Sequence, residues 1–565
     1  MTGRQRPFRR RKPADIAGLA GLDPVLAGLY SARGVRFGEE LDYSLAKLAP
    51  IGSLEGVEVA VRLLLLHRNR RIVVVGDFDA DGATSTALVL RCLSGFGFGD
   101  VGYLVPNRFE YGYGLTPEIV DVAAQRRPDL LVTVDNGVSS VAGVERAREL
   151  GIKVLVTDHH LPGRDLPRAA AMVNPNLPGS RFASPNLAGV GVAFYLMAAL
   201  GRALEDSGVA GAARLPARFL DLVALGTVAD VVRLDHNNRI LVSQGLARLR
   251  AGQAVPGVLA LMAQAGRSAA RATSSDLGFA AGPRLNAAGR LEDMSIGIEC
   301  LLTDDPARAA QLAATLDQIN RERREIESVM RDQAFSAMKS IRDSGLPNCV
   351  CIYDESWHQG VVGLIAARVR EQYHRPVVAF ARERAGELKG SVRSVPGVHA
   401  RDLLEAVATR HPGLIARFGG HAMAAGLSLA ESDFDAFAAA ADKELLLRHP
   451  DADFSGAILT DGSLPADALT LRFAQTLREA GPWGAGFPEP VFEGDFRVVE
   501  QRTVGERHLK LRVLAGEGQA QIDAIAFNQQ DPGIRGRARL AYRLDVNEYR
   551  GVEAPQLVVE QITPL

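Results

Sequence analysis

Three aspartates at alternate positions, Asp77, Asp79 and Asp81, stand in the sequence GDFDADG. Carboxylates this close together repel one another unless a positive charge lies between them, and a metal ion is the natural candidate. The same spacing begins an EF-hand calcium loop, which ends with a bidentate glutamate at its twelfth position. Counted from Asp77 that position is Leu88, and the preceding run RIVVV reads as a buried strand rather than a helix. An EF-hand is therefore rejected, and a solvated acidic turn and a catalytic metal site remain.

Two further β-rich runs also end in aspartate. DLLVTVD ends at Asp135, and KVLVTD ends at Asp158, which is followed by His159 and His160. Each run precedes a helical stretch, so residues 71 to about 235 predict βαβ units, with a parallel sheet covered by helices on both faces. Because ligands bind beyond the carboxyl ends of such strands, we expect these side chains to share one crevice.

One more acid, Asp230, interrupts the apolar stretch DLVALGTVADVVRL. An unpaired buried carboxylate is costly, so Asp230 needs an arginine, a helix cap or a metal ion as its partner. The candidate metal ligands are Asp79, Asp81, Asp135, His159 and Asp230. A set rich in oxygen with one imidazole favours Mn²⁺ or Mg²⁺ over zinc. With a shared carboxylate it could hold two ions ~3.5–4 Å apart, the arrangement that activates water in phosphoester displacement.

Composition sets wide limits on the protein class. The 565 residues, 47% of them hydrophobic and 23% charged, are typical of a globular protein with several domains. A net charge of −1 argues neither for nor against nucleic acid, because binding requires only a local basic surface. Four scattered cysteines fit a reducing cytoplasm better than a disulfide framework. No apolar run reaches the ~18 residues of a membrane span.

The remaining chain predicts four further regions and an N-terminal arm. The arm, MTGRQRPFRRRKPAD, carries six basic residues before its first acid. It is not a secretory signal, since no apolar region follows, and we expect a disordered solvated arm rather than one that touches a polyanion.

The segment GFAAGPRLNAAGR, with Arg284, Asn286 and Arg290, has the composition of a loop. A long apolar stripe with helical spacing then predicts a connecting helix, a second α/β unit follows it, and alternating residues after Asp451 predict a small antiparallel barrel or sandwich. The expected domains are 1–45 (arm and lead-in), 46–305 (catalytic), 306–345 (connecting helix), 346–447 (second α/β) and 448–565 (β-barrel).

Two stretches have residues suited to single-stranded nucleic acid. VPNRFEYGYGL places Arg108 beside Tyr111 and Tyr113, and a cation with aromatic faces suits splayed bases. The alternative is a tyrosine-containing surface loop. RHLKLRV offers a basic strand face, although such a face is more often simply solvated.

Five motifs in order resemble one superfamily. DFDADG, VDNG, TDHH and ALGTVAD resemble motifs one to four of the DHH phosphoesterases, and GGHAMAAG resembles the signature of their DHHA1 domain. RLNAAGR and the three-domain layout are similar to the branch formed by bacterial single-strand-specific 5′→3′ DNA exonucleases, which act in recombination and repair. The β-barrel then resembles an OB-fold.

The resemblance implies roles for individual residues. Asp79 would bind one ion and Asp81 the other, Asp135 would bridge them, and His159 and Asp230 would complete the second. Asp77 and Asp158 would support the site, with Asp158 orienting an imidazole. His160 would contact the scissile phosphate or act near the leaving group. The expected phosphate- or DNA-binding residues are Arg108, Tyr111, Tyr113, Arg284, Asn286, Ser391, Arg393 and His421.

Two rival functions follow from the same superfamily. One is a phosphodiesterase for cyclic dinucleotides or very short oligonucleotides, but those relatives lack the long connector and the extra β-domain. The other is an inactive scaffold, which requires lost ligands, whereas every motif carboxylate and histidine is present here. The resemblance also implies a monomer that acts on single-stranded DNA, with a single-strand-binding protein and a helicase as candidate partners.

Overall fold

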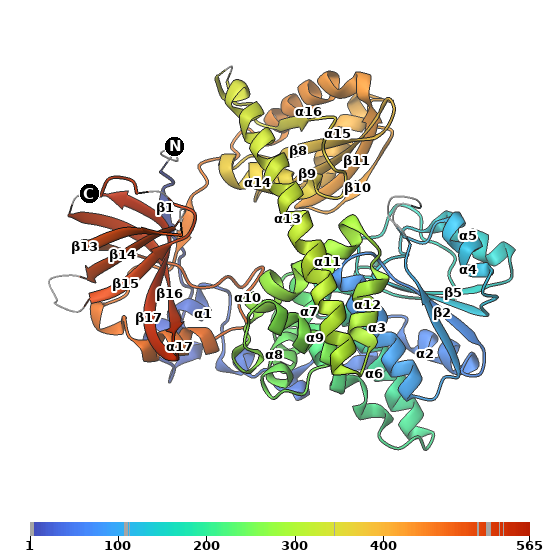
Figure 1. Ribbon diagram of the computed structural model, residues 1–565. Coiled ribbons are helices and arrows are strands. Elements are labelled where there is room, and N and C mark those ends of the chain that lie inside the picture. Colours follow the sequence, from blue (N-terminus) through green and yellow to red (C-terminus); the bar gives the residue numbers. More distant parts are fainter. Residues whose placement is uncertain are drawn as a thin grey trace. The chain divides into compact units, whose positions relative to one another are not determined.

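The buried runs of the first α/β region form a five-stranded sheet in the computed structural model (Figure 1). The structure describes residues 5–106, 111, 114–343, 345–505, 508–515, 521–529, 531–534 and 536–565. All strands of this sheet run parallel. In spatial order they are β3 (Asp100–Leu104), β2 (Arg71–Val75), β4 (Leu130–Val134), β5 (Lys153–Thr157) and β6 (Ala171–Val173).

Alternate residues of the central strands enter two separate cores. Ile72 and Val74 of β2 pack with helices α3 and α6, whereas Val73 and Val75 pack with α4 and α5. Burial of both faces explains why these strands read as uninterrupted apolar runs. The prediction of a parallel sheet with helices on both faces is confirmed. The helices are α2 (Val57–Leu66), α3 (Ala80–Gly95), α4 (Pro117–Ala124), α5 (Val141–Glu149) and α6 (Gly189–Asp206).

A group of helices follows the sheet, and the same large core continues into it. Its members are α7 (Leu220–Ala229), α8 (His236–Arg250), α9 (Pro256–Gln264), α10 (Ser274–Asp276), the π-helical turn η8 (Leu277–Ala281), α11 (Gly282–Leu291) and α12 (Ser295–Leu302). The segment GFAAGPRLNAAGR is therefore helical, and its prediction as a loop is wrong. Pro283 follows the end of η8 by two positions, inside a helical run that is continuous from residue 274 to residue 291.

The predicted connecting helix is present as α13 (Pro306–Asp343). The chain divides into two compact units within this helix. One unit contains residues 1–289, 293–317 and 457–565, and the other contains residues 290–292 and 318–456. Over the part of the chain that the structure describes, no helix has both the length and the apolarity that a membrane crossing needs.

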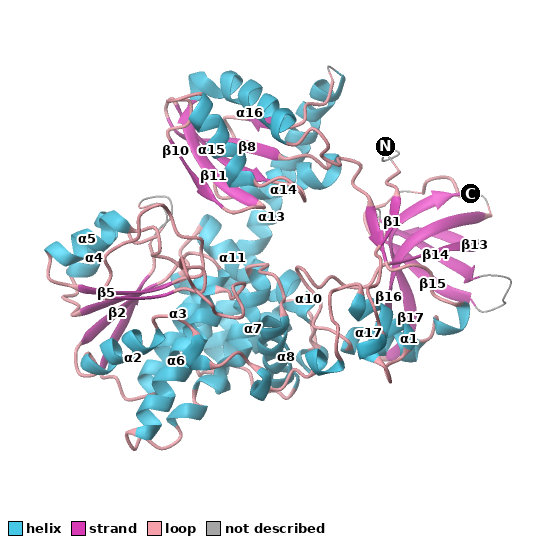
Figure 2. Ribbon diagram, turned by 180° about the vertical axis from the view of Figure 1, so that it is seen from behind, coloured by secondary structure: helices cyan, strands magenta, loops and turns pink. Residues whose placement is uncertain are grey.

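The second unit is built on a mixed sheet (Figure 2). Only β7 and β8 are parallel, and the remaining pairs are antiparallel. In order the strands are β10 (Arg417–Gly420), β11 (Ala424–Ala430), β9 (Glu387–Arg393), β8 (Val377–Arg384) and β7 (Val350–Tyr353). Its other helices are α14 (Val362–Tyr373), α15 (Ala400–Arg410) and α16 (Phe434–Arg448).

The C-terminal region closes into a five-stranded barrel. The barrel is not wholly antiparallel, because β15 and β17 pair in parallel to close it. Its strands are β13 (Phe492–Val504), β14 (His508–Ala515), β15 (Gln521–Ala526), β16 (Arg537–Tyr549) and β17 (Val552–Pro564), and α17 (Leu471–Glu479) packs against it.

The N-terminal arm is ordered against this C-terminal region. Strand β1 (Phe8–Arg10) pairs in parallel with β12 (Ile458–Thr460), and α1 (Pro24–Ser31) contributes Leu29 to the barrel core. The buried carboxylate of Asp461 binds Arg11 at 2.9 Å and Arg33 at 2.9 Å. From residue 5 onward the expectation of a disordered arm is wrong, because β1 pairs with β12 and Arg11 binds a buried acid 450 positions away.

Candidate metal centre

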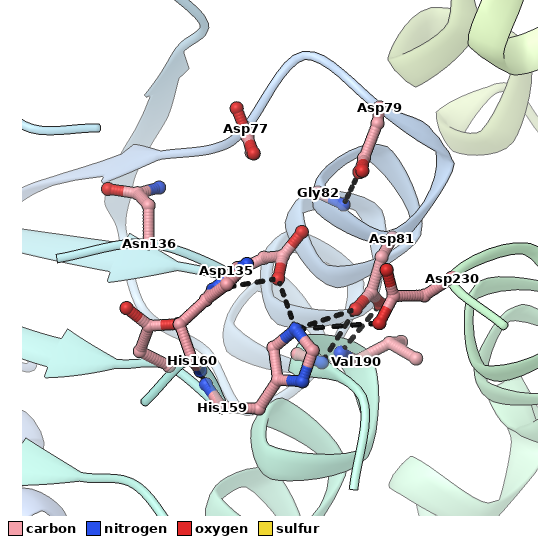
Figure 3. A network of polar contacts seen from close by, with 12 residues as sticks. Asp77, Asp79, Asp81, Gly82, Asp135, Asn136, His159, His160, Val190 and Asp230 are labelled. Atoms are coloured by element: carbon pink, nitrogen blue, oxygen red, sulfur yellow. Dashed lines mark hydrogen bonds and ion pairs between the residues drawn. The ribbon is translucent and has the colours of Figure 1, made fainter. Parts of the chain in front are cut away.

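The loop after β2 is packed tightly onto the start of α3. Asp79 caps this helix, and its carboxylate accepts a hydrogen bond of 3.0 Å from Gly82 N (Figure 3). A Cβ on Gly82 would lie 2.6–2.7 Å from the backbone of Asp77. Gly82 is therefore required for close packing of the preceding loop on the first turn of α3.

Asp81 lies in the first turn of α3 and is fully buried. Its two carboxylate oxygens accept hydrogen bonds from Gly189 N at 2.6 Å and Val190 N at 2.9 Å. These donors are the first backbone amides of α6, which no intrahelical carbonyl can satisfy. The start of α6 therefore holds the Asp81 carboxylate by its amides and by the positive end of the helix dipole.

Asp135 follows β4 in the left-handed region of the backbone, with φ of 62°. This conformation is unfavourable for a residue with a Cβ, and it directs the carboxylate toward α6. Only glycine fits at position 189 without a shift, because a Cβ added there would lie 2.6 Å from Cβ of Asp135. Asp135 and Asp81 thus contact the same helix start.

The imidazole of His159 lies among three carboxylates (Figure 3). Its Nε2 atom is 3.1 Å from Oδ1 of Asp135, 3.5 Å from Oδ2 of Asp230 and 4.0 Å from Oδ2 of Asp81. Asp230 directly follows α7. Side chains from four separate segments therefore converge at one edge of the sheet.

Asp158 organises the loop after β5. Its carboxylate accepts hydrogen bonds from the backbone amides of Val138, His159 and His160, and it contacts Nδ1 of His160 at 2.7 Å. Burial acts to raise the pKa of Asp158, but His160 and these hydrogen bonds outweigh it and lower the pKa to about 2. Burial likewise acts to lower the pKa of His160, and Asp158 outweighs it and raises the pKa to about 9. The pair is thus a carboxylate and an imidazolium at neutral pH.

The remaining carboxylates are crowded and buried. Burial, followed by the charges of Asp81 and Asp79, raises the pKa of Asp135 well above its ordinary value. The same causes raise the pKa of Asp230, and burial together with Asp79 raises that of Asp81 to about 7. These groups cannot all be ionised without a cation between them. Oxygen donors with an imidazole fit Mn²⁺ or Mg²⁺ better than zinc.

Three sets of side chains place their ligand atoms within 4.8 Å of one another among the described residues. The sets are Asp77 with Asp79 and Asp135, Asp81 with His159 and Asp230, and Asp135 with His159 and His160. Asp135 belongs to the first set, and its Oδ1 lies 3.1 Å from Nε2 of His159 in the second. This arrangement fits two ions that share one carboxylate, and it places Asp77 as close to the site as Asp79.

Comparison with known proteins agrees with this architecture. Residues 71–227 match the DHH family N-terminal domain, residues 346–446 match the DHHA1 domain, and residues 460–561 match the RecJ OB domain. The single-stranded-DNA-specific exonuclease RecJ of Dickeya dadantii is 53% identical over 572 residues, which cover 99% of both chains. The chain belongs to the RecJ family.

Solved RecJ structures extend the likeness to three dimensions. The crystal structure of RecJ from Thermus thermophilus in complex with Mn²⁺ matches with a TM-score of 0.80 and 31% identity, covering 99% of this chain and 80% of that one. The Mg²⁺ complex of the same protein matches with a TM-score of 0.75 and 29% identity, over 99% and 78% of the two chains. These RecJ structures contain the two metals that the donor set of this chain fits.

Two of the predicted phosphate ligands have other partners in this RecJ-family chain. Arg284 is buried, and its Nε and terminal nitrogens contact Oδ1 of Asp317 at 2.9 and 2.7 Å. Asn286 accepts a hydrogen bond of 2.8 Å from Ala80 N, at the first residue of α3. Asn286 thereby holds the metal-site loop in place, a role that the sequence did not reveal because the two residues are 206 positions apart.

The other predicted contacts lie in the second unit or beside residues that the structure does not describe. Arg393 and Ser391 are neighbours on β9, with NH1 of Arg393 donating to Ser391 Oγ at 3.0 Å. His421 follows β10, and β11 pairs with β9 so that Ala424 lies opposite Arg393. Ser391, Arg393 and His421 therefore lie toward the same end of these neighbouring strands. Tyr111 is half-buried, and Arg108 and Tyr113 lie outside the described residues.

The basic strand face of the barrel is largely neutralised. Lys510 binds Asp523 at 2.8 Å, and Arg512 binds Glu500 at 3.1 Å. His508 lies on β14, and Arg507 is outside the described residues. The face is thus a ladder of ion pairs between neighbouring strands, which sequence alternation alone does not reveal.

Proposed function

We propose that this chain is a metal-dependent exonuclease that degrades single-stranded DNA from its 5′ end in recombination and repair. The observation that carries the proposal is the convergence of His159 with the carboxylates of Asp81, Asp135 and Asp230 around Nε2. Membership of the RecJ family, whose relatives are named single-stranded-DNA-specific exonucleases, supports the substrate class.

We assign two ions to two of the three sets of side chains. Asp77, Asp79 and Asp135 would hold one ion, and Asp81, His159 and Asp230 would hold the other. Asp135, whose Oδ1 lies 3.1 Å from Nε2 of His159, would be shared between them. When bound, such a pair activates water and stabilises the charge that develops on the attacking and leaving oxygens. This assignment adds Asp77 to the expected ligands, in place of a purely supporting role.

The chain's own residues would position the substrate and hold a proton. Asp158 fixes the imidazole of His160 through Nδ1, and this contact raises the pKa of the ring and favours its protonated form. We assign the second ring nitrogen, Nε2, to an oxygen of the scissile phosphate. The start of α6 holds the Asp81 carboxylate, and Asn286 holds the loop that carries Asp79, so the ligands are preorganised before substrate binds.

The wider assignments follow the predicted domains. Residues 46–305 would carry hydrolysis, 306–345 would connect, 346–447 would bind phosphates, and 448–565 would bind the strand. Ser391, Arg393 and His421 would contact phosphates, as would Arg284 and Asn286 beyond the contacts they already make. The segment with Arg108, Tyr111 and Tyr113 would contact bases. We further propose a cytoplasmic monomer that receives strands from a helicase and a single-strand-binding protein.

Labelled DNA tests the proposal. A single strand labelled at its 5′ end, the same strand labelled at its 3′ end, the blunt duplex, and a cyclic dinucleotide are incubated with Mn²⁺ or Mg²⁺, with and without chelator. We expect loss of the 5′ label first, chelator sensitivity and little digestion of duplex.

Asp135→Asn should lose activity by ~10³-fold or more, as removal of a central catalytic group does. The exposed Asp121→Asn is the matched control. Equal digestion of duplex, or full activity of Asp135→Asn, contradicts the proposal.

Arg393 tests the role of the second unit. Arg393→Ala should raise KM for single-stranded DNA by about tenfold, since a charge-assisted hydrogen bond to phosphate is worth roughly 1.5–3 kcal/mol. Mn²⁺ binding, followed by calorimetry, should stay at the wild-type level. Arg384→Ala, on the exposed end of β8, is the control. Loss of bound Mn²⁺ in Arg393→Ala would count against a phosphate role.

A further inference from the structure

A groove of about 960 Å³ lies in the first unit between the end of α7, the π-helical turn η8 and the barrel. Val228 and Val231, which stand on either side of Asp230 in sequence, both line it. One wall of the groove is therefore formed by the segment that carries Asp230. The opposite wall contains Phe527, which directly follows β15 of the barrel.

Large apolar side chains face solvent along this groove. Phe279 is 79% exposed, Val231 is 69% exposed and Phe527 is 51% exposed. Exposed apolar side chains gathered along one hollow mark binding sites more often than isolated ones do. The backbone also supports a binding site here, because Val231 has a φ of 61°, a rare conformation for a β-branched residue.

Phe279 is held on a rigid support beside the metal ligands. It lies in η8, and π-helical turns occur frequently at functional sites. A Cβ on Gly278 would lie 3.2 Å from Val228 Cγ1, so the turn packs closely on the helix that leads to Asp230. The aromatic ring is thus exposed while the backbone beneath it is fixed.

Four of the five arginines that line the groove are paired with acids, and the fifth, Arg250, donates to the backbone carbonyl of Ala272 at 2.9 Å. The four pairs are Arg267 with Asp276 at 3.5 Å, Arg271 with Glu553 at 3.1 Å, Arg478 with Asp545 at 2.8 Å and Arg543 with Glu489 at 2.5 Å. Such pairs leave little positive charge to attract phosphates. The groove is therefore suited to bases rather than to a sugar–phosphate backbone.

We propose that Phe279 and Phe527 are stacking platforms for unpaired bases of the strand being degraded, an inference that rests on the proposed function. Phe279, in the turn that packs on α7, would position the bases nearer the metal centre, and Phe527 would hold bases farther along the strand. Bases in a duplex are stacked and paired, so they cannot offer their faces to either ring. The two residues would thereby contribute to the selection of single strands.

The test uses the full-length protein and a 20-nucleotide single strand. Phe279→Ala and Phe527→Ala should each raise KM by about 5- to 100-fold, since stacking on an aromatic side chain is worth ~1–3 kcal/mol per base. Phe279→Trp and Phe527→Trp should retain tight binding. Phe37→Ala, 62% exposed and outside the groove, is the control. Thermal unfolding checks that each variant is folded.

A direct readout of stacking separates this inference from a general loss of binding. Strands with 2-aminopurine at successive positions, bound in the presence of chelator, should show fluorescence quenching at one position that Phe279→Ala abolishes and at another that Phe527→Ala abolishes. If wild type cleaves the strand while both alanine variants match its KM and its quenching, the inference is overturned. If wild type neither binds nor cleaves the strand, the proposed function has failed instead.

Discussion

Gly189 at the start of α6 offers a sharp test of how the metal centre is held. A Cβ added there would lie 2.6 Å from Cβ and 2.7 Å from Oδ1 of Asp135. Ordinary contacts are 3.4–4 Å, so Gly189→Ala must move the two segments apart by about 1 Å. The backbone amide of the same residue holds the Asp81 carboxylate at 2.6 Å, so both carboxylates would be displaced together.

The expected cost is larger for activity than for stability. Metal ligands must sit within about 0.2 Å of their proper distances, and a displacement of ~1 Å at a catalytic position can cost ~10²-fold. Overpacking of this kind lowers the free energy of unfolding by only about 1–3 kcal/mol. We therefore expect Gly189→Ala to remain folded, with kcat/KM on single-stranded DNA lowered ~10²-fold and a higher Mn²⁺ concentration needed for half-maximal rate.

The assay is a Mn²⁺ titration of exonuclease rate beside a thermal melt. Gly28→Ala is the matched control, because a Cβ on that helical glycine meets no atom within 4 Å. Wild-type rate and wild-type Mn²⁺ dependence in folded Gly189→Ala would refute the argument that α6 positions these ligands. An equal loss in Gly28→Ala would show that the effect is not local to the site.

Three further outcomes test neighbouring contacts. Asn286→Leu should lower kcat about tenfold and stability by roughly 1 kcal/mol, because Ala80 N loses its acceptor; unchanged kinetics would remove Asn286 from the site. Arg284→Met should lower the free energy of unfolding by about 1.5–3 kcal/mol, because buried Asp317 loses its charge-assisted hydrogen bonds to Arg284, and the double variant with Asp317→Leu should recover part of that loss in a denaturant melt. Metal-free protein should lose stability as pH rises through about 7, because the pKa of Asp81 is higher in the folded protein than in the unfolded chain. The contribution of Asp81 to the free energy of unfolding is present at acid pH and is lost once the pH has risen past about 7. Added Mn²⁺ should abolish most of that loss, and a melt with no such pH dependence would contradict the crowding of charges.

Much of the metal centre could be predicted from local patterns. Alternating burial makes β2, β4 and β5 read as apolar runs, and parallel strands place their carboxyl ends at one edge. The positions of Asp135 and His159 follow directly from that rule. The alternation of the C-terminal region predicted a barrel for the same reason, although the parallel pairing of β15 with β17 was not expected.

Other features depended on contacts between distant segments. Asn286 and Gly189 act on residues far away in the chain, and Arg11 of the N-terminal arm pairs with Asp461 because the fold brings that buried acid beside it. Whether an arginine is available or already paired depends in the same way on its neighbours in space. Local sequence determined which residues could bind metal and where the strands would end, since both follow from side-chain type and short-range periodicity. Only the tertiary structure decided which amides, glycines and charges surround them, because packing between separate elements sets those distances.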